Sequence, residues 1–541
     1  MVHSIHFFWN RIGRRKCFWI PVLFFTISTY GYSIFSRTIS IDDLASDVYV
    51  GSGQVMIAAD RWGMNVTSFL DAIPRVSPAS DRLLATCFLL VAAFLLPCSF
   101  YHVHHEEGNN LFVYKYTVLS CSLITYPIIG EIWEYSGANY LTTGGMLLSI
   151  VTCYYLDTRK TYGIKELLTA GIIMTLPMSS YESGVLFYVT LVCAVLMYQY
   201  CLWGDQNGAR IYWKKTLLYA SPLFIAFALR KIIGFSLRMA LGVAKGSNGA
   251  TVIQWGNAPF SEVLRKTVID SFLNYIVNGI VYLPITIFLI SAFFIIGLII
   301  YRTIKQKNLM IMVAGVVLLC SVFILPLIQG AFMQYRTAIS LSAFVSYSMF
   351  CLIECFERHR KVIKVIAIGL VIYLIWVQSE YLNSELALNT QRSENEMRFM
   401  SGIAQNILKT DTEKPVIFVG EYDIGDYFRE AKTDYSDSVR GQLYQRAIQA
   451  LKNRYGDYYY TYFHITEFPD SNVNSVINYS LAVDGMMEKY LSYLGYDIQV
   501  IDRMSNPNIF SCAKEIVDSK QMYPYDVTET DDFIIATLKL Q

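Results

Sequence analysis

Long apolar segments alternate with short polar segments over the first 381 residues of the chain. A helix needs about 20 mostly apolar residues to cross the hydrocarbon core of a bilayer. By this criterion the sequence predicts eleven membrane-spanning helices, over residues 17–36, 82–101, 113–130, 138–156, 164–180, 184–203, 217–236, 279–301, 309–327, 338–356 and 363–381. The least regular of these segments is 164–180, which Pro177 and two serines interrupt.

After residue 381 the pattern becomes that of a water-soluble domain of mixed α/β structure. The run Pro415–Gly420 is predicted as a strand, because it is apolar and has turn-forming residues at both ends. Helices are expected near 439–450 and 482–494, and further strands at 498–501 and 533–538. We therefore predict a membrane module over 1–381, with its first outside loop at 37–81, and an α/β domain over 382–541.

Composition supports a membrane protein and excludes several other classes. Apolar residues make up 54% of the chain and charged residues 16%, against about 25% charged residues in ordinary soluble proteins. The net charge of +1 and the lack of basic runs argue against nucleic-acid binding. The 11 cysteines lie mostly in or beside apolar segments and form no zinc-ligand pattern, so no metal and no cofactor is predicted.

The loops predict the orientation of the chain. Lysine and arginine gather in alternate loops, near residues 11–16, 159–160, 210–215, 302–307 and 358–364, whereas the opposite loops at 131–137 and 181–183 contain none. Cytoplasmic loops carry the excess of these residues. With eleven spans, the N-terminus is cytoplasmic and the C-terminal domain is outside, which in a bacterium is the periplasm.

The first outside loop contains a short amphipathic pattern. Apolar residues at 41, 44, 45, 48 and 49 share one helical face. Asp42 and Asp43 fall in the first turn, where the helix dipole favours carboxylates. They either cap and solubilise an interfacial helix, or one of them is a general base that removes a proton from an acceptor hydroxyl. Arg61 is a candidate to tune that base, and Trp62 offers a flat surface on which a sugar can stack.

Further polar residues lie at the ends of predicted spans on the same side. These residues are Glu131, Glu134, Tyr181 and Glu182. Placing an ionisable side chain in or beside a membrane span costs free energy. Several such side chains at one depth therefore indicate either a polar cavity or simple placement at the membrane interface.

One span followed by a loop with an acidic pair and then an Arg-Trp segment resembles the GT-C superfamily of membrane glycosyltransferases. Within it, Ile41-Asp-Asp-Leu44 together with Asp60-Arg-Trp-Gly63 is similar to the bacterial Gtr-type glucosyltransferases that modify O-antigen in lipopolysaccharide and so convert serotype. The resemblance implies a GT-C-like polytopic α-helical membrane protein of the inner membrane with a periplasmic C-terminal domain.

The resemblance also implies a reaction. An inverting enzyme would move a sugar, expected to be glucose, from undecaprenyl phosphate to a lipid-linked O-antigen glycan at the periplasmic face. Asp42, or else Asp43, would be the base, and Glu131 or Glu182 would hold sugar hydroxyls. Arg336 and then Arg230 are the preferred cations for the donor phosphate. A flippase and a donor synthase are the expected functional partners.

Two alternatives remain open at the level of sequence. One is a polymerase or ligase of lipid-linked glycans, and the other is a non-enzymatic transporter or flippase. A transporter is expected to have paired halves and charges at the membrane midplane. Here the charges lie on one face and no repeat is evident, which favours chemistry at the outer surface.

Overall fold

The computed structural model describes residues 8–36, 38, 53–67, 78–101, 110–133, 138–159, 162–202, 208–246, 254–271, 273, 284–331, 338–356, 361–410, 413–422, 439–456 and 475–538. The chain forms two compact units. The first contains Met1–Phe35 and Ser52–Leu386, and the second contains Ser36–Gly51 and Ala387–Gln541. The helix predicted over 41–49 lies outside the described residues.

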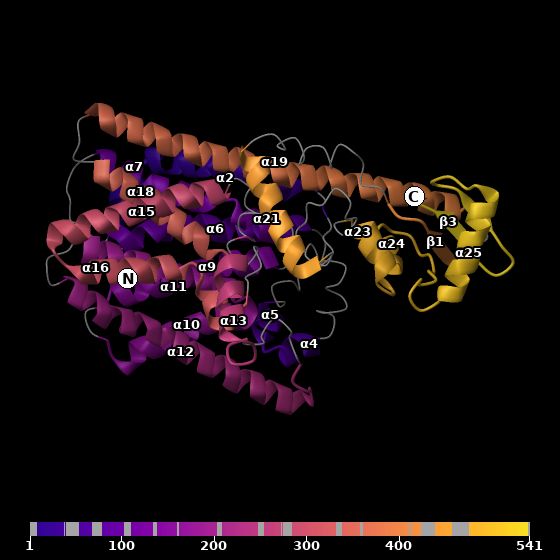
Figure 1. Cartoon of the computed structure of the whole chain (residues 1–541), viewed down its shortest axis with the longest axis horizontal. Coiled ribbons are helices and arrows are strands. Elements are labelled where there is room, and N and C mark those ends of the chain that lie inside the picture. The colour runs from indigo at the N-terminus through magenta and orange to yellow at the C-terminus, as the bar shows by residue number, and fades with distance from the viewer. Residues whose placement is uncertain are drawn as a thin grey trace. The chain divides into compact units, whose positions relative to one another are not determined.

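The first unit is built from helices (Figure 1). They are η1 (Trp9–Gly13), α2 (Lys16–Phe35), α4 (Gly53–Ala58), α5 (Trp62–Thr67), α6 (Pro78–Tyr101), α7 (Asn110–Thr125), α8 (Ile128–Trp133), α9 (Ala138–Asp157), α10 (Ile164–Ser180), α11 (Ser183–Leu196), η3 (Met197–Leu202), α12 (Gly208–Leu241), α13 (Phe260–Arg265), η5 (Lys266–Asp270), α15 (Pro284–Gln306), α16 (Leu309–Ser321), α17 (Ile324–Gln329), α18 (Ser340–Phe356) and the first part of α19 (Lys361–Ile407).

Helices coincide with all the segments that hydropathy selected, so the chain is a helical membrane protein. Among the described residues, six helices are long and apolar enough to cross a bilayer: Lys16–Phe35, Ala79–Tyr101, Ser183–Leu202, Ile211–Leu241, Thr286–Gln306 and Lys361–Ile407. Two more apolar helices, Leu309–Ser321 and Ser340–Phe356, are shorter. The predicted segments 113–130 and 309–327 are each divided between two helices. The total of eleven crossings stays a prediction.

Burial within the first unit separates a protein-facing surface from a lipid-facing one. Helix α18 is almost wholly buried, from Ser340 to Phe350. By contrast, Leu217 and Phe224 of α12 and Ile27 of α2 are exposed to between 68 and 76%. Exposed side chains of this size on long apolar helices are suited to contact with lipid tails, because a bilayer accepts apolar surface that water does not.

Close helix contacts in this unit depend on glycine. A Cβ atom on Gly184 of α11 would lie 2.9 Å from the Cα atom of Gly145 of α9. Ser149, also in α9, donates a hydrogen bond from its Oγ to the carbonyl oxygen of Gly184 at 2.8 Å. Small residues of this kind allow helix backbones in membranes to approach closely. Helices α9 and α11 are therefore held together at the start of α11.

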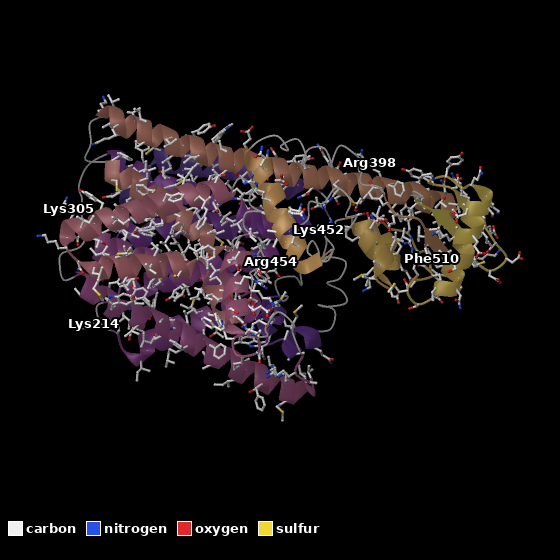
Figure 2. All side chains as sticks on the ribbon, in the orientation of Figure 1. Lys214, Lys305, Arg398, Lys452, Arg454 and Phe510 are labelled. Atoms are coloured by element: carbon white, nitrogen blue, oxygen red, sulfur yellow. The ribbon has the colours of Figure 1, made fainter. Side chains whose placement is uncertain are left out.

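The ends of α12 lie at opposite sides of the first unit. Figure 2 shows Lys214 of α12 and Lys305 of α15 at one end of the helices. Arg238 lies 24 residues beyond Lys214 in the same helix, about 36 Å away at 1.5 Å per residue. That separation is enough to cross a hydrocarbon core of about 30 Å. The orientation of this helix in the membrane stays a prediction from loop charges.

The second unit contains the predicted α/β elements together with others. Its elements are the last part of α19, β1 (Val416–Val419), α21 (Val439–Tyr455), α23 (Val476–Ala482), α24 (Met486–Tyr493), α25 (Pro507–Lys520), β2 (Val527–Glu529) and β3 (Ile534–Thr537). The sheet order is β1-β3-β2. Strand β1 is parallel to β3, with Val416 opposite Ile534, and β2 is antiparallel to β3.

Some elements of the second unit differ from the prediction. The predicted strand at 498–501 is reduced to one parallel bridge between Val416 and Val500. The predicted helix over 482–494 is shorter: α24 begins at Met486, after Gly485 with its left-handed φ of 74°, and Ala482 is the last residue of the preceding helix α23. The core has two layers, one on each face of the sheet: Val416 and Phe418 point into one, and Ile417 and Val419 into the other.

Candidate functional site

The best-defined polar site of the first unit begins where α4 ends. The N–H of Asp60 donates to the carbonyl oxygen of Ile57 at 3.1 Å, and the N–H of Arg61 donates to that of Met56 at 2.7 Å. This pair of bonds forms a Schellman motif, in which the residue after the helix takes a left-handed conformation. Asp60 occupies that position with a φ of 59°. Glycine is usual there, and aspartate and asparagine are the side chains that tolerate it best.

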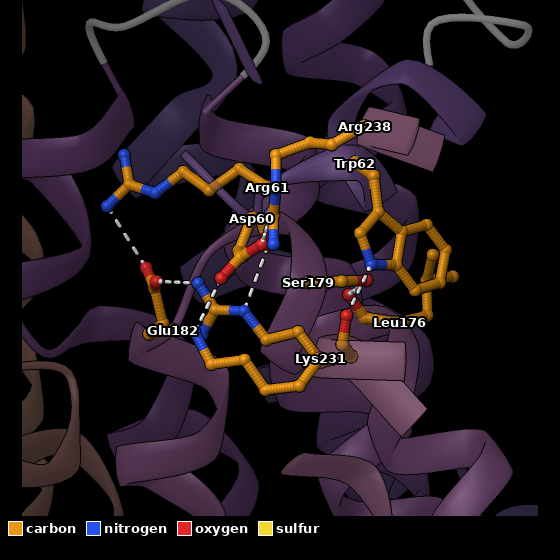
Figure 3. A network of polar contacts seen from close by, with 9 residues as sticks. Asp60, Arg61, Trp62, Leu176, Ser179, Glu182, Lys231 and Arg238 are labelled. Atoms are coloured by element: carbon orange, nitrogen blue, oxygen red, sulfur yellow. Dashed lines mark hydrogen bonds and ion pairs between the residues drawn. The ribbon is translucent and has the colours of Figure 1, made fainter. Parts of the chain in front are cut away.

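The carboxylate of Asp60 is buried and paired with two cations of α12 (Figure 3). Its Oδ2 accepts a hydrogen bond from Lys231 Nζ at 2.5 Å, and its Oδ1 is bonded to Arg238. The side chain is only 5% exposed. A carboxylate at such depth is tolerated because it is paired and hydrogen-bonded.

The backbone of Asp60 also contacts α12. Its carbonyl oxygen accepts a hydrogen bond from Arg230 Nε at 2.9 Å. Arg230 extends further, and its Nη2 donates to Glu182 Oε1 at 2.8 Å. Glu182 Oε2 accepts from Arg61 Nη2 at 3.1 Å. Two guanidinium groups therefore converge on the carboxylate of Glu182, which lies in the turn between α10 and α11.

Trp62 fixes the start of α5 against α12. Its indole N–H donates to the carbonyl oxygen of Arg230 at 3.2 Å. The next residue, Gly63, lies against the end of α10, where a Cβ atom would come within 2.8 Å of the backbone carbon of Ser179. The α4–α5 segment is therefore packed onto α10 and α12, and it carries Asp60 and Arg61 with it.

The charges in this site lower the pKa values of both carboxylates. Burial raises the pKa of Asp60, but the hydrogen bonds and charges of Lys231 and Arg238 outweigh this effect, so its pKa lies below the ordinary value. Burial likewise raises the pKa of Glu182, and Arg61 and Arg230 more than offset it, so its pKa is also lowered. A carboxylate that is held ionised by two cations is a weak proton acceptor at neutral pH. Glu182 is thus suited to hold the two arginines.

The described part of the site carries an excess of positive charge. Arg61, Arg230, Lys231 and Arg238 face the carboxylates of Asp60 and Glu182. The side chains of Arg61 and Lys231 are 33% and 45% exposed, so both cations are accessible to a ligand. Arginine presents several donors in a planar fork that matches the oxygens of a phosphate or carboxylate. The arrangement can therefore bind an anionic group.

Only part of the predicted site falls on described residues. Arg61, Trp62, Glu182 and Arg230 are brought together. Tyr181 adjoins Glu182 in sequence but packs, partly buried, against the hydrophobic core of the first unit. The remaining predicted residues have no described side chain: Asp42, Asp43, Glu131, Glu134 and Arg336. Trp62 is 9% exposed, and its role in stacking a sugar stays a prediction.

Sequence reasoning did not assign a role to Asp60, although it lies in the motif that carries the resemblance. Two signals were present. Asp60 follows a Gly53–Ala58 segment at a position where a helix stops, and the spacing of Arg230, Lys231 and Arg238 places three cations along one side of α12. Neither signal shows that the two segments meet, because that contact depends on the tertiary fold.

The family described as Glucosyl transferase GtrII matches residues 31–353. The chain belongs to this family. The match covers the Asp60 site in full, with the α4–α5 segment, Glu182 and the cations of α12, and it ends before α19. This member of the GtrII family is accordingly a membrane glucosyltransferase. Comparison with curated proteins gave no match, and comparison with solved structures gave none either.

Proposed function

We propose that this GtrII-family protein transfers glucose from undecaprenyl phosphate to a lipid-linked O-antigen glycan at the periplasmic face of the bacterial inner membrane. The observation that carries the proposal is the convergence of Arg61 and Arg230 on Glu182, beside Lys231 and Arg238. Four cations face two carboxylates at the end of α12 opposite to Lys214. A phosphate on a membrane lipid is the anion expected at such a position.

The proposed reaction joins two lipid-linked substrates with the help of a base. The acceptor hydroxyl oxygen forms a bond to the anomeric carbon of the glucose as the bond from that carbon to the phosphate oxygen breaks. The electron pair of the broken bond stays on undecaprenyl phosphate, and the hydroxyl proton passes to the base. Attack from the face opposite the leaving phosphate inverts the anomeric centre. Asp42 is the proposed base, and Asp43 is the second choice.

The charge of the donor changes during this step, and this explains the need for cations. The donor is a phosphodiester with one negative charge, whereas the leaving group is a phosphomonoester that develops a second. Groups that stabilise charge as it forms accelerate the step, because they bind the transition state more strongly than the substrate. Arg230 and Arg61 are suited to this role, together with Arg336 outside the described residues.

The membrane arrangement proposed for this activity has eleven crossings and a GT-C-like module. It places the N-terminus in the cytoplasm and the C-terminal unit in the periplasm. Membership of a glucosyltransferase family favours this activity over a non-enzymatic flippase or transporter. Lys214 and Arg238 lie toward opposite ends of α12. Because Lys214 belongs to a loop predicted to be cytoplasmic, this supports an outer location for the cationic site.

Reconstitution tests the proposal directly. The purified full-length protein would be placed in vesicles with undecaprenyl-phosphate-glucose and a lipid-linked O-antigen acceptor, and glucosylated acceptor would be measured. We expect transfer that depends on both lipids, and a product whose anomeric configuration is opposite to that of the donor. Transfer from a nucleotide sugar in the absence of the lipid donor would contradict the proposal.

A further inference from the structure

The contacts of Asp60 go beyond those needed to end a short helix. Its two carboxylate oxygens bind Lys231 and Arg238, while its backbone carbonyl binds Nε of Arg230. One residue of the α4–α5 turn thus contacts three cationic side chains of α12. Arg238 lies about two turns beyond Arg230 and Lys231 on the same side of the helix, so Asp60 fixes the face of α12 that carries the site.

Helix α12 is shaped to receive this carboxylate. Gly234 lies one turn after Arg230, and a Cβ atom there would be 2.7 Å from Asp60 Oδ1 and 3.5 Å from Cδ1 of Trp62. A glycine in the middle of a helix lowers stability relative to alanine. The close approach of Asp60 gives a reason for that cost, since any side chain at position 234 would push the carboxylate away from its cations.

The left-handed backbone conformation of Asp60 and its negative charge have separate roles. A φ of 59° is satisfied by glycine, asparagine or aspartate. Closing α4 therefore does not require a negative charge. The charge is used instead on Lys231 and Arg238, which it holds beside Arg230.

We propose that Asp60 is a positioning residue of the glucosyl transfer, which orients Arg230 toward the leaving phosphate through its contacts with α12. This inference rests on the function proposed above and adds a residue to it. Asp60 touches neither substrate in this role. The carboxylate anchors the α4–α5 turn on Lys231 and Arg238, and this fixes the carbonyl oxygen of Asp60 that accepts from Nε of Arg230. Held there, Arg230 reaches Glu182 with Nη2.

A positioning role has a kinetic signature that a purely structural role lacks. The phosphate gains a second negative charge only as the bond to glucose breaks, so a displaced Arg230 weakens the transition state more than the bound donor. Loss of the Asp60 charge should lower kcat more than it raises the KM for the donor. A variant that is merely less stable would lose folded protein, but each folded molecule would keep its kcat.

The test compares four purified full-length variants with the wild type in vesicles containing undecaprenyl-phosphate-glucose and the lipid-linked acceptor. Asp60→Asn removes the charge and keeps the size. Asp60→Gly suits the left-handed backbone best and removes the side chain. Gly234→Ala keeps the charge but crowds it. Glu354→Gln is the control, because it breaks a buried ion pair between α7 and α18 that has no part in the site.

The measurements are kcat per folded molecule, the donor KM and the melting temperature. We expect kcat to fall at least about tenfold in both Asp60 variants. Loss of a group that donates a hydrogen bond directly to the reacting atoms usually lowers kcat more, by about 10²–10³. The donor KM should change by less than about threefold. Gly234→Ala should follow the same pattern, and Glu354→Gln should lower the melting temperature with kcat unchanged.

The possible results separate the two proposals. Wild-type kcat in Asp60→Asn and Asp60→Gly, with an active wild-type enzyme, would overturn the positioning role and leave the proposed function in place. If Asp60→Asn fails to fold, wild-type kcat in Asp60→Gly or Gly234→Ala would overturn it equally. A wild-type protein that does not use undecaprenyl-phosphate-glucose would overturn the proposed function and, with it, this inference.

Discussion

The indole N–H of Trp62 donates to the backbone carbonyl oxygen of Arg230, at 3.2 Å. This carbonyl belongs to α12, where the regular helical pattern already gives it a donor four residues later. A carbonyl oxygen has two lone pairs, so the Trp62 bond is a second bond and its loss leaves no orphaned acceptor. We predict that Trp62→Phe lowers the free energy of unfolding by about 1 kcal/mol or less.

Trp62→Ala provides the comparison for that variant. It removes a buried ring that is 9% exposed and packs beside α12. Truncation of a buried aromatic side chain usually costs about 3–5 kcal/mol. Denaturation of both variants in detergent would measure the difference. Equal losses in the two variants would show that the hydrogen bond, and not the ring, holds α5 in place.

Arg230→Lys should reduce activity although it preserves the charge. Arg230 uses Nε for the carbonyl oxygen of Asp60 and Nη2 for Glu182. A lysine ammonium is a point charge without this fork, so it cannot reproduce both bonds in the same geometry. Loss of one charge-assisted bond of about 1.5–3 kcal/mol corresponds to a fall of about 10- to 140-fold in kcat/KM.

The matched control is Lys231→Arg. Lys231 is 45% exposed at its side chain and contacts Asp60 through a single nitrogen. An arginine there keeps the charge and has room to reach solvent, so we expect activity within about threefold of the wild type. Donor-dependent transfer rates in vesicles measure both variants. Similar losses for the two would contradict a special role of the Arg230 fork.

The buried ion pair between Lys115 of α7 and Glu354 of α18 gives a prediction about stability. Its atoms are 2.5 Å apart, and the side chains are 1% and 8% exposed. Removing one member of a buried pair takes that pairing from the remaining buried charge and costs about 3–5 kcal/mol. Glu354→Gln should therefore destabilise the protein strongly.

The double variant Lys115→Met/Glu354→Leu should recover most of that loss, because it removes both charges of the pair. Replacement of both members of such a pair by apolar residues is often neutral or stabilising. Melting temperatures in detergent would compare the single and double variants. A double variant less stable than Glu354→Gln would show that the pair itself stabilises the unit.

The lowered pKa values of Asp60 and Glu182 predict how the site responds to acid. Each carboxyl is ionised more readily in the folded state than in the unfolded state. Its contribution to stability is therefore complete above the unfolded pKa, near 4, and is lost as the pH falls through the lower folded pKa. We expect the contribution of these two carboxylates to be constant from neutral pH to about pH 5 and to decline below about pH 4.

Asp60→Asn should reduce this acid-dependent decline, since asparagine does not titrate. Melting temperatures measured between pH 3 and 7 in the wild type and the variant would show it. The prediction concerns the difference between the two curves, because other carboxylates contribute equally to both. Parallel curves would indicate that Asp60 has the same pKa in the folded and unfolded states.

The sequence predicts Asp42 as the general base, and a substitution tests that role independently of the described site. Asp42→Asn should abolish glucosyl transfer while membrane insertion and melting temperature stay unchanged, because asparagine has the same shape but accepts no proton. Asp43→Asn is the matched control and should retain measurable transfer. Wild-type transfer by the double variant Asp42→Asn/Asp43→Asn would refute a base in this pair.

Much of the helical architecture could be predicted from sequence, because apolar length alone selects membrane helices. The pairing within the site is a different matter. Glu182 and Arg230 are predicted from their charge and position near the end of a span, and Arg61 from its charge and place in the first outside loop. The sequence does not show that Arg61 and Arg230 share Glu182, nor that Asp60 lies between Lys231 and Arg238. These contacts join α4, α10, α11 and α12, and they depend on how the helices pack.

Other differences have local causes. Helix α19 continues to Ile407, far beyond the predicted end of its span at residue 381. Polar residues such as Asn383 and Glu385 end the apolar pattern, but they do not end a helix, because helix propensity does not require apolar side chains. Helix α24 begins only after Gly485, because this residue has a left-handed backbone conformation. The helical pattern of the residues around Gly485 does not reveal that conformation.

The contact between Gly145 and Gly184 has a consequence for enzymology. Glu182 lies two residues before Gly184, which α9 holds through its own glycine and through Ser149. The distance between the backbones of α9 and α11 therefore sets the position of the Glu182 carboxylate relative to Arg61 and Arg230. A methyl group added to Gly145 would contact no charged atom. It would instead press on Gly184 and so shift the start of α11, next to Glu182. Mutational screens for catalysis in this enzyme should include the uncharged residues at the contact between α9 and α11.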